Sequence, residues 1–164
     1  MIERHYLDDC VSQLRALKAQ ADKAIAQVDD AQFFALLDAD ANSIAMIVKH
    51  VAGNMRSRWT DFLTTDGEKP DRHRDTEFER ESGDTRGAIL GRWEAGWDLL
   101  LTTVTSLQPD DLEKSVTIRG EPHTVVQAIV RQMSHYASHV GQIVLLAKHY
   151  AGPNWKTLSI PKRK

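Results

Sequence analysis

The chain is organised around one stretch, Met133-Ser-His-Tyr-Ala-Ser-His-Val-Gly-Gln-Ile-Val-Leu-Leu-Ala147. Within it, His135 and His139 stand four residues apart. On a helix, both imidazoles leave the same face about 6 Å apart. One nitrogen of each ring can then reach the same divalent metal ion, because neutral imidazole is a common metal ligand and bonds zinc at about 2.0–2.1 Å. The stretch therefore predicts a helix that carries part of a metal site.

The third ligand is expected from a second apolar stretch, Ile44-Ala-Met-Ile-Val-Lys-His-Val-Ala-Gly-Asn54, in which His50 lies beside the apolar stripe of a helix. Helix bundles build metal sites from side chains on facing helices. Asn54, one turn from His50, is the candidate for a neighbour that orients this ring. The alternative is that each histidine simply hydrogen-bonds a backbone carbonyl or a loop carboxylate.

The spacing of apolar residues predicts four long helices and no internal repeat. They are expected at residues 2–28, from Asn42 or Ser43 to about Leu63, from Asp84 or Thr85 to about Leu107, and at residues 125–150. A short helical turn capped by Asp30 follows the first, and residues 115–124 alternate in the manner of a small β-hairpin. The predicted fold is all-α, a four-helix bundle forming a single domain over residues 1–164.

A polar, highly charged stretch connects the second and third predicted helices, at residues 64–84, with Phe78 as its one large apolar residue. Its turn residues predict an ordered loop across one end of the bundle. Asp75 and Glu77 in this loop are weak candidates for catalytic acid–base groups. Arg58 and Asp61, at the end of the second helix, are expected to form an ion pair that fixes the loop. A glycine at position 53 suggests close approach of a neighbouring helix or ligand.

Composition excludes several classes of protein. A net charge of −2 over 164 residues gives no electrostatic footprint for nucleic acid. The single cysteine, Cys10, excludes an intrachain disulfide and a thiolate metal cluster, and its place on an apolar stripe predicts burial. Trp59, Trp93 and Trp97 are expected in the core or in a dimer contact. With no signal peptide and no membrane-spanning run in the sequence, a cytoplasmic location is expected.

Two segments resemble a known family. The first is Arg58-Trp-Thr-Asp-Phe-Leu-Thr-Thr-Asp-Gly-Glu-Lys-Pro70, followed by Arg74-Asp75 and Glu77-Phe78, and the second is His135-Tyr-Ala-Ser-His-Val-Gly-Gln-Ile143. Together with one histidine in the second helix, they are similar to an uncharacterised branch of the DinB-like (YfiT-like) metal-binding four-helix bundles. The resemblance covers about residues 5–155. It implies helices that run up, down, down and up, a homodimer, and nickel or zinc on His50, His135 and His139 together with waters.

The resemblance implies an enzyme class that includes thiol-dependent transferases and isomerases and hydrolases, acting on a small molecule that the sequence does not identify. The expected function is a metal-dependent enzyme, with transfer of a low-molecular-weight thiol ahead of hydrolysis. The alternative is a protein that is not an enzyme: a helix bundle that binds metal or a partner protein, for example in a stress response. A third possibility is that no metal binds. A site closed by a fourth protein ligand would favour a structural role, whereas three histidines with open positions are typical of catalytic zinc.

Overall fold

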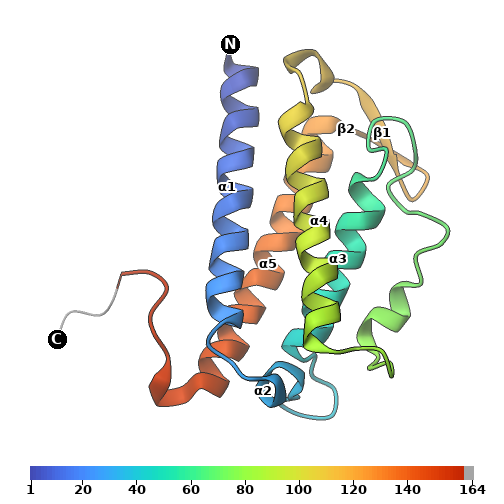
Figure 1. Cartoon of the computed structure of the whole chain (residues 1–164). Helices are drawn as coiled ribbons and strands as arrows, with labels where there is room; N and C mark the ends of the chain where they lie inside the picture. The colour runs from blue at the N-terminus through green and yellow to red at the C-terminus, as the bar shows by residue number, and fades with distance from the viewer. Residues whose placement is uncertain (161–164) are drawn as a thin grey trace.

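The computed structural model describes residues 1–160 and is mostly helical, which confirms the predicted fold class at that level (Figure 1). Within this range it has five α-helices and one hairpin: α1 (Ile2–Ile25), α2 (Asp30–Phe34), α3 (Ile44–Trp59), α4 (Arg86–Ser106), α5 (Val125–Ala151), β1 (Ser115–Ile118) and β2 (Glu121–Thr124). Three short 3-10 turns lie at Arg74–Phe78, Pro109–Asp111 and Gly152–Asn154. None of the helices in residues 1–160 has the length and apolarity needed to cross a membrane.

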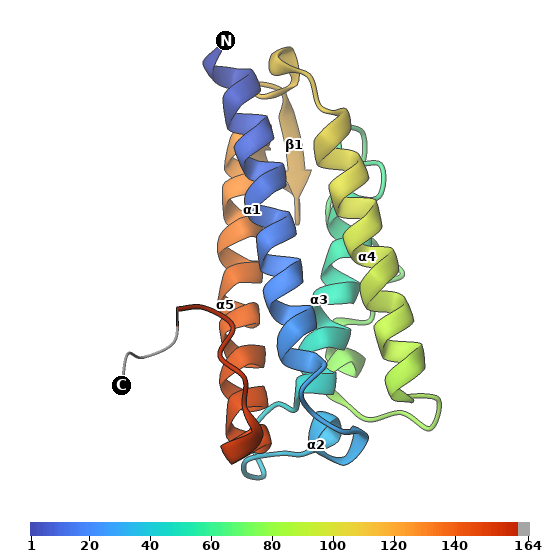
Figure 2. The same cartoon turned by 60° about the vertical axis from the view of Figure 1, so that its left-hand side comes forward.

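The four long helices lie side by side, with α1 and α5 running in one direction and α3 and α4 in the other (Figures 1 and 2). The closest packing is between α3 and α4, and between α1 and α5. Since α3 and α4 run in the same direction, the chain between them must return along the length of a helix. A helix of 21 residues, the length of α4, spans about 30 Å. The 64–84 segment is ordered but runs along the side of α3, so the expectation that it crosses one end of the helices is wrong.

Most helices begin at a side chain that accepts a hydrogen bond from the first turn, as their sequences predict. Ser43 accepts from the N–H of Met46 at 3.1 Å, and Thr85 accepts from that of Ala88 at 3.2 Å. Thr124 and Gln127 form a reciprocal capping box at the start of α5. The cap of α2 is Asp29 with Gln32, one residue before the expected Asp30.

Helix α3 ends at Trp59, before the expected Leu63, because the backbone turns at Asp61. Asp61 has a φ of 49°, and its carbonyl accepts hydrogen bonds from the N–H groups of Thr64 and Thr65. The left-handed conformation is compatible with aspartate but ends a right-handed helix. The predicted α-helix over residues 60–63 is therefore replaced by a turn.

Aromatic residues form the centre of the core, which confirms burial of the three tryptophans. Trp59, Trp93, Trp97 and Tyr136 are each no more than 1% exposed, and Cys10 is buried as expected. The Trp59 Nε1–H group donates to the Tyr136 hydroxyl at 2.9 Å. The buried indole N–H of Trp59 thus has a hydrogen-bond acceptor on α5, next to His135.

The hairpin forms as predicted and holds the start of the long loop. Its two-residue turn places Arg119 at a φ of 56° and Gly120 at a φ of 76°. The Asp66 carboxylate accepts the N–H groups of both turn residues, at 2.9 and 2.8 Å. The Gly67 N–H also donates to the carbonyl of Thr117. These contacts fix the loop relative to α5, into which the hairpin leads.

Candidate metal centre

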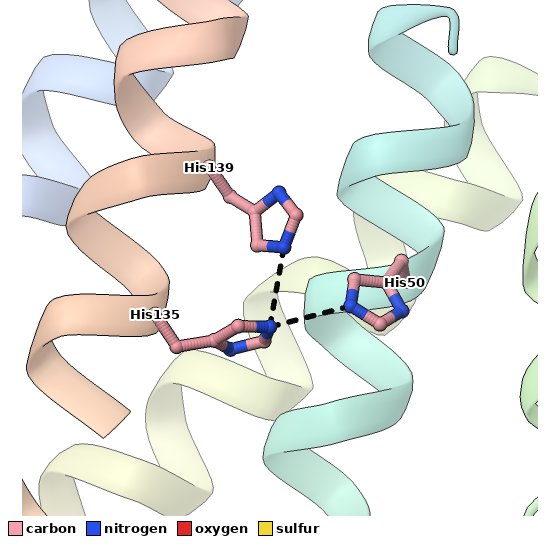
Figure 3. A group of neighbouring side chains, drawn as sticks. All are labelled: His50, His135 and His139. Carbon is pink, nitrogen blue, oxygen red and sulfur yellow. Dashed lines mark hydrogen bonds between the residues drawn. The ribbon is translucent and has the colours of Figure 1, made fainter. Parts of the chain in front are cut away.

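The three predicted ligands meet between α3 and α5. Figure 3 shows His50 on α3 pointing toward His135 and His139, which leave α5 one turn apart. The Nε2 atom of His135 lies 3.4 Å from that of His50 and 3.1 Å from that of His139. One candidate ligand atom from each ring lies within 4.8 Å of the others. The structure therefore brings together the three histidines that the sequence proposed as ligands.

In two of the rings, the Nδ1 atom, which points away from the other histidines, has a hydrogen-bond acceptor. This contact determines which nitrogen of the neutral ring carries the proton. The Nδ1–H of His50 donates to Glu77 Oε2 at 2.8 Å, and that of His139 donates to Gln142 Oε1 at 2.8 Å. In a neutral imidazole the other nitrogen then carries a lone pair. The Nε2 atoms of His50 and His139 therefore both present lone pairs toward His135, whose single proton can satisfy only one of them.

This arrangement fits a divalent metal ion. A cation among three Nε2 atoms would accept all three lone pairs, which no distribution of protons among neutral rings achieves. Nitrogens bound at about 2.0–2.1 Å to one tetrahedral zinc lie about 3.3 Å apart, close to the 3.1 and 3.4 Å found here. His135 Nδ1 is buried and has no hydrogen-bond partner in residues 1–160. Imidazole donors of this kind suit several divalent transition metals, zinc and nickel among them.

The electrostatic environment keeps the paired rings on α5 neutral. Burial lowers the pKa of His135 to about 3, and the charges of His139, His50, Arg58 and Arg72 act in the same direction. Burial also lowers the pKa of His139, although its hydrogen bond to Gln142 opposes this effect. Because a metal binds the neutral ring, these shifts favour the ligand form at physiological pH.

Glu77 is the group that positions His50. Its side chain is 9% exposed, and the carboxylate accepts two hydrogen bonds from Arg72, at 2.9 Å each, in addition to that from His50. Burial raises the pKa of Glu77, but the hydrogen bonds from His50 and Arg72 outweigh burial, so the pKa lies below its usual value. A carboxylate behind a histidine ligand fixes the ring and increases its basicity. The sequence suggests Glu77 as a weak candidate for an acid–base group, whereas the structure places it behind His50, a candidate metal ligand.

Gly53 provides the space for this carboxylate. A Cβ atom at position 53 would overlap Glu77 Oε1 and lie 2.8 Å from Glu77 Cδ. The close approach suggested by the sequence at this glycine is thus an approach of the loop. We expect Gly53→Ala to displace Glu77 from His50 and weaken zinc binding about 10-fold, the lower end of the effect of losing a partner behind a ligand. Zinc titration of the purified variant against a chromophoric chelator measures this change.

Gly91→Ala on α4 is the matched control, because a Cβ atom there would meet nothing within 4 Å. It gains the same helix propensity and should bind zinc with the wild-type affinity. Equal zinc affinity in Gly53→Ala and wild type would contradict the role assigned to Glu77.

The other sequence candidates have different places. Asp75 has a 95% exposed side chain and lies 3.5 Å from Arg74, so it is not at the site. Asn54 accepts from the Tyr136 hydroxyl at 2.9 Å rather than orienting His50, which is held by Glu77. Gln142 was missed, although its i+3 spacing from His139 placed it on the same helix face.

The expected Arg58–Asp61 ion pair is also wrong. Arg58 is 3% exposed and reaches Glu68 at 3.6 Å, because α3 ends before Asp61 can lie one turn from Arg58. Together with His50, Asn54 and His135, Arg58 lines a cavity of about 440 Å³. A second cavity, lined by residues of α3, α4 and the loop, contains none of the three histidines. The cavity lined by Arg58 therefore adjoins the candidate metal centre at His50 and His135.

A comparison with known protein families identifies the family of this chain. No curated protein matches the chain. The model of a family described as "Protein of unknown function (DUF1572)" matches residues 1–164, the whole sequence. The chain therefore belongs to the DUF1572 family.

Proposed function

We propose that this protein is a metal-dependent enzyme of the DinB-like group, in which His50, His135 and His139 hold nickel or zinc. The proposed reaction is transfer of a low-molecular-weight thiol to a small molecule, with hydrolysis as the second candidate. The observation that carries the proposal is the convergence of three imidazole Nε2 atoms beside a cavity, with two of the rings held from behind. Within residues 1–160 this cluster has three members, which favours a catalytic over a closed structural site.

The DinB-like assignment is supported by three features. The directions of the four long helices follow the order that the resemblance implies, the long connection joins the second and third of them, and the histidines lie on the second and fourth. A homodimer and a cytoplasmic location, both expected from the sequence, are further parts of this proposal. Light scattering of the purified protein tests the dimer.

The protein's own residues have separable roles in this mechanism. A metal held here would lower the pKa of a bound water or thiol, which makes either a nucleophile near neutral pH. Glu77 and Gln142 accept from the Nδ1–H groups of His50 and His139, which places the lone pair of each neutral ring on the inward Nε2 atom and fixes the direction of the ring. Burial of His50 and Glu77 keeps water from competing with the hydrogen bond between them. The cavity beside His50 and His135 provides the space in which a substrate can reach the centre.

The experiment is elemental analysis of untagged protein, followed by activity screening of the metal-loaded form. Thiol transfer would be assayed with several low-molecular-weight thiols and electrophilic acceptors, and hydrolysis with activated esters and amides. We expect about one nickel or zinc per chain, and turnover that falls about 100-fold in His139→Ala, since one of three ligands is lost. His5→Ala on α1, which removes an exposed histidine, should keep the wild-type rate.

An unchanged rate in His139→Ala would rule out the proposed metal-dependent reaction. A bound metal without activity in either screen would favour the alternative of a non-catalytic metal-binding protein.

A further inference from the structure

Arginine side chains from four parts of the chain converge on the cavity beside His50 and His135. They are Arg58 from α3, Arg72 and Arg74 from the long loop, Arg119 from the hairpin turn, and Arg131 from α5. Arg58 and Arg72 are buried, whereas the other three are exposed. No carboxylate lines this cavity among the residues that the structure describes. Its wall is therefore cationic from the interior to the surface.

Acidic side chains behind this wall compensate only part of its charge. Glu68 lies 3.0 Å from Arg119, 3.4 Å from Arg72 and 3.6 Å from Arg58. Glu77 binds Arg72, but it also accepts the hydrogen bond from His50. Asp75 meets Arg74 only at 3.5 Å and from an exposed position. Two carboxylates are thus shared among the arginines of the interior, and a metal ion would add further positive charge.

Arg58 is the least compensated of these groups. Its side chain is 3% exposed, and its Nε and Nη1 atoms have no hydrogen-bond partner in residues 1–160. A buried guanidinium is normally matched by a carboxylate at hydrogen-bond distance, because removing the charge from water is unfavourable. The nearest carboxylate is that of Glu68, at 3.6 Å. The amide oxygen of the buried Gln132, on the same cavity wall, is also without a partner among the described residues.

We infer that this cavity binds the anionic group of the substrate, a carboxylate or phosphate, and holds the molecule beside the metal centre. Guanidinium groups bind both kinds of oxyanion through charge-assisted, bidentate hydrogen bonds. Such an anion would compensate Arg58 and the unmatched charges of the rim, and the positions of His50 and His135 in the same wall place the rest of the molecule at the metal. The inference rests on the proposed function, since it names the substrate class of that site.

The test is calorimetric titration with inorganic phosphate and with malonate, on chelator-treated protein and on zinc-loaded protein. We expect binding of at least one of these anions in both forms, weakened by added salt because the contacts are ionic. Arg58→Gln should weaken binding about 10- to 30-fold, as for the loss of one charge-assisted hydrogen-bonding group. Arg131→Gln, at the exposed rim, should weaken it about 3-fold and leaves the folded core untouched.

Arg15→Gln is the control, because it removes one positive charge from the exposed face of α1, away from the cavity. It should bind both anions with the wild-type affinity. If Arg58→Gln does not fold, the anion affinities of Arg131→Gln and Arg15→Gln are compared instead, and only that of Arg131→Gln should be weaker than wild type. Absence of binding at 20-fold molar excess in millimolar titrations, or equal affinity in all variants, would overturn the inference. Anion binding without metal binding would instead refute the proposed function alone, so the two failures are distinguishable.

Discussion

His135→Ala is expected to lose tight binding of zinc or nickel, with an affinity about 100- to 1,000-fold below wild type. The Nε2 atom of His135 is the central one of the three, 3.4 Å from that of His50 and 3.1 Å from that of His139. Four ligands of a structural zinc together supply about 10–16 kcal/mol, so one ligand corresponds to about 2.5–4 kcal/mol, or about two to three powers of ten in affinity. Competition titration with a chelator of known affinity measures the change.

His149→Ala is the control on the same helix, because His149 is exposed near the end of α5. It should retain one metal per chain with the wild-type affinity. The folded state of His135→Ala should persist, since the removed ring is only half-buried and its Nδ1 makes no hydrogen bond in residues 1–160. Circular dichroism separates metal loss from unfolding. Tight metal binding by His135→Ala would refute the proposed ligand set.

Lys49→Met is expected to destabilise the protein by about 3 kcal/mol at pH 7. The Lys49 side chain is 6% exposed and lies on α3, where its ammonium group meets Asp84 at 2.7 Å and Glu81 at 2.6 Å. Asp84 is 2% exposed, and its other charged neighbour, Arg92, is 3.7 Å away. Methionine preserves the length of the side chain but leaves Asp84 as a buried carboxylate without its main partner. Breaking such a pair destabilises proteins by about 3–5 kcal/mol.

The destabilisation should shrink in acid. Burial raises the pKa of Asp84, but the hydrogen bonds from Lys49 and from the Glu81 N–H outweigh burial and hold the pKa below its usual value. The contribution of the Asp84 carboxylate to the free energy of unfolding is therefore complete at pH values above its pKa in the unfolded chain, about 3.9. It is lost as the pH falls through the pKa of Asp84 in the folded protein. Without Lys49, burial raises the Asp84 pKa, so the carboxyl of the variant is protonated at a higher pH. Wild type and variant should converge in stability between about pH 5 and pH 3.

Lys18→Met is the matched control, because Lys18 also bridges two carboxylates but at the surface. Its partners Asp22 and Glu94 are 37% and 55% exposed. Removing an exposed ion pair changes stability by less than about 1 kcal/mol. Urea unfolding at several pH values compares the variants. Equal stabilities of Lys49→Met and Lys18→Met would contradict the importance assigned to the buried pair.

The sequence by itself determined the helices, the hairpin and the set of candidate ligands. Apolar periodicity and capping residues such as Ser43 and Thr85 act within one or two helical turns, so they can be read from neighbouring positions. The four-residue spacing of His135 and His139 likewise fixes their common face once the helix forms. His50 could be named because a histidine beside an apolar stripe has few other uses. The order of helix directions came from the resemblance and not from these patterns.

Only the tertiary structure decided what surrounds the histidines. Glu77 reaches His50 across 27 positions of sequence, and its approach depends on a loop that returns along α3 because α3 and α4 run in the same direction. From the sequence, the loop is predicted to cross one end of the bundle, and Arg58 is predicted to pair with Asp61. The ion pair is inferred from helical spacing, which does not show where the helix ends. The arginines of the cavity come from α3, the loop, the hairpin and α5. Their convergence depends on packing between distant segments, which no local pattern of residues encodes.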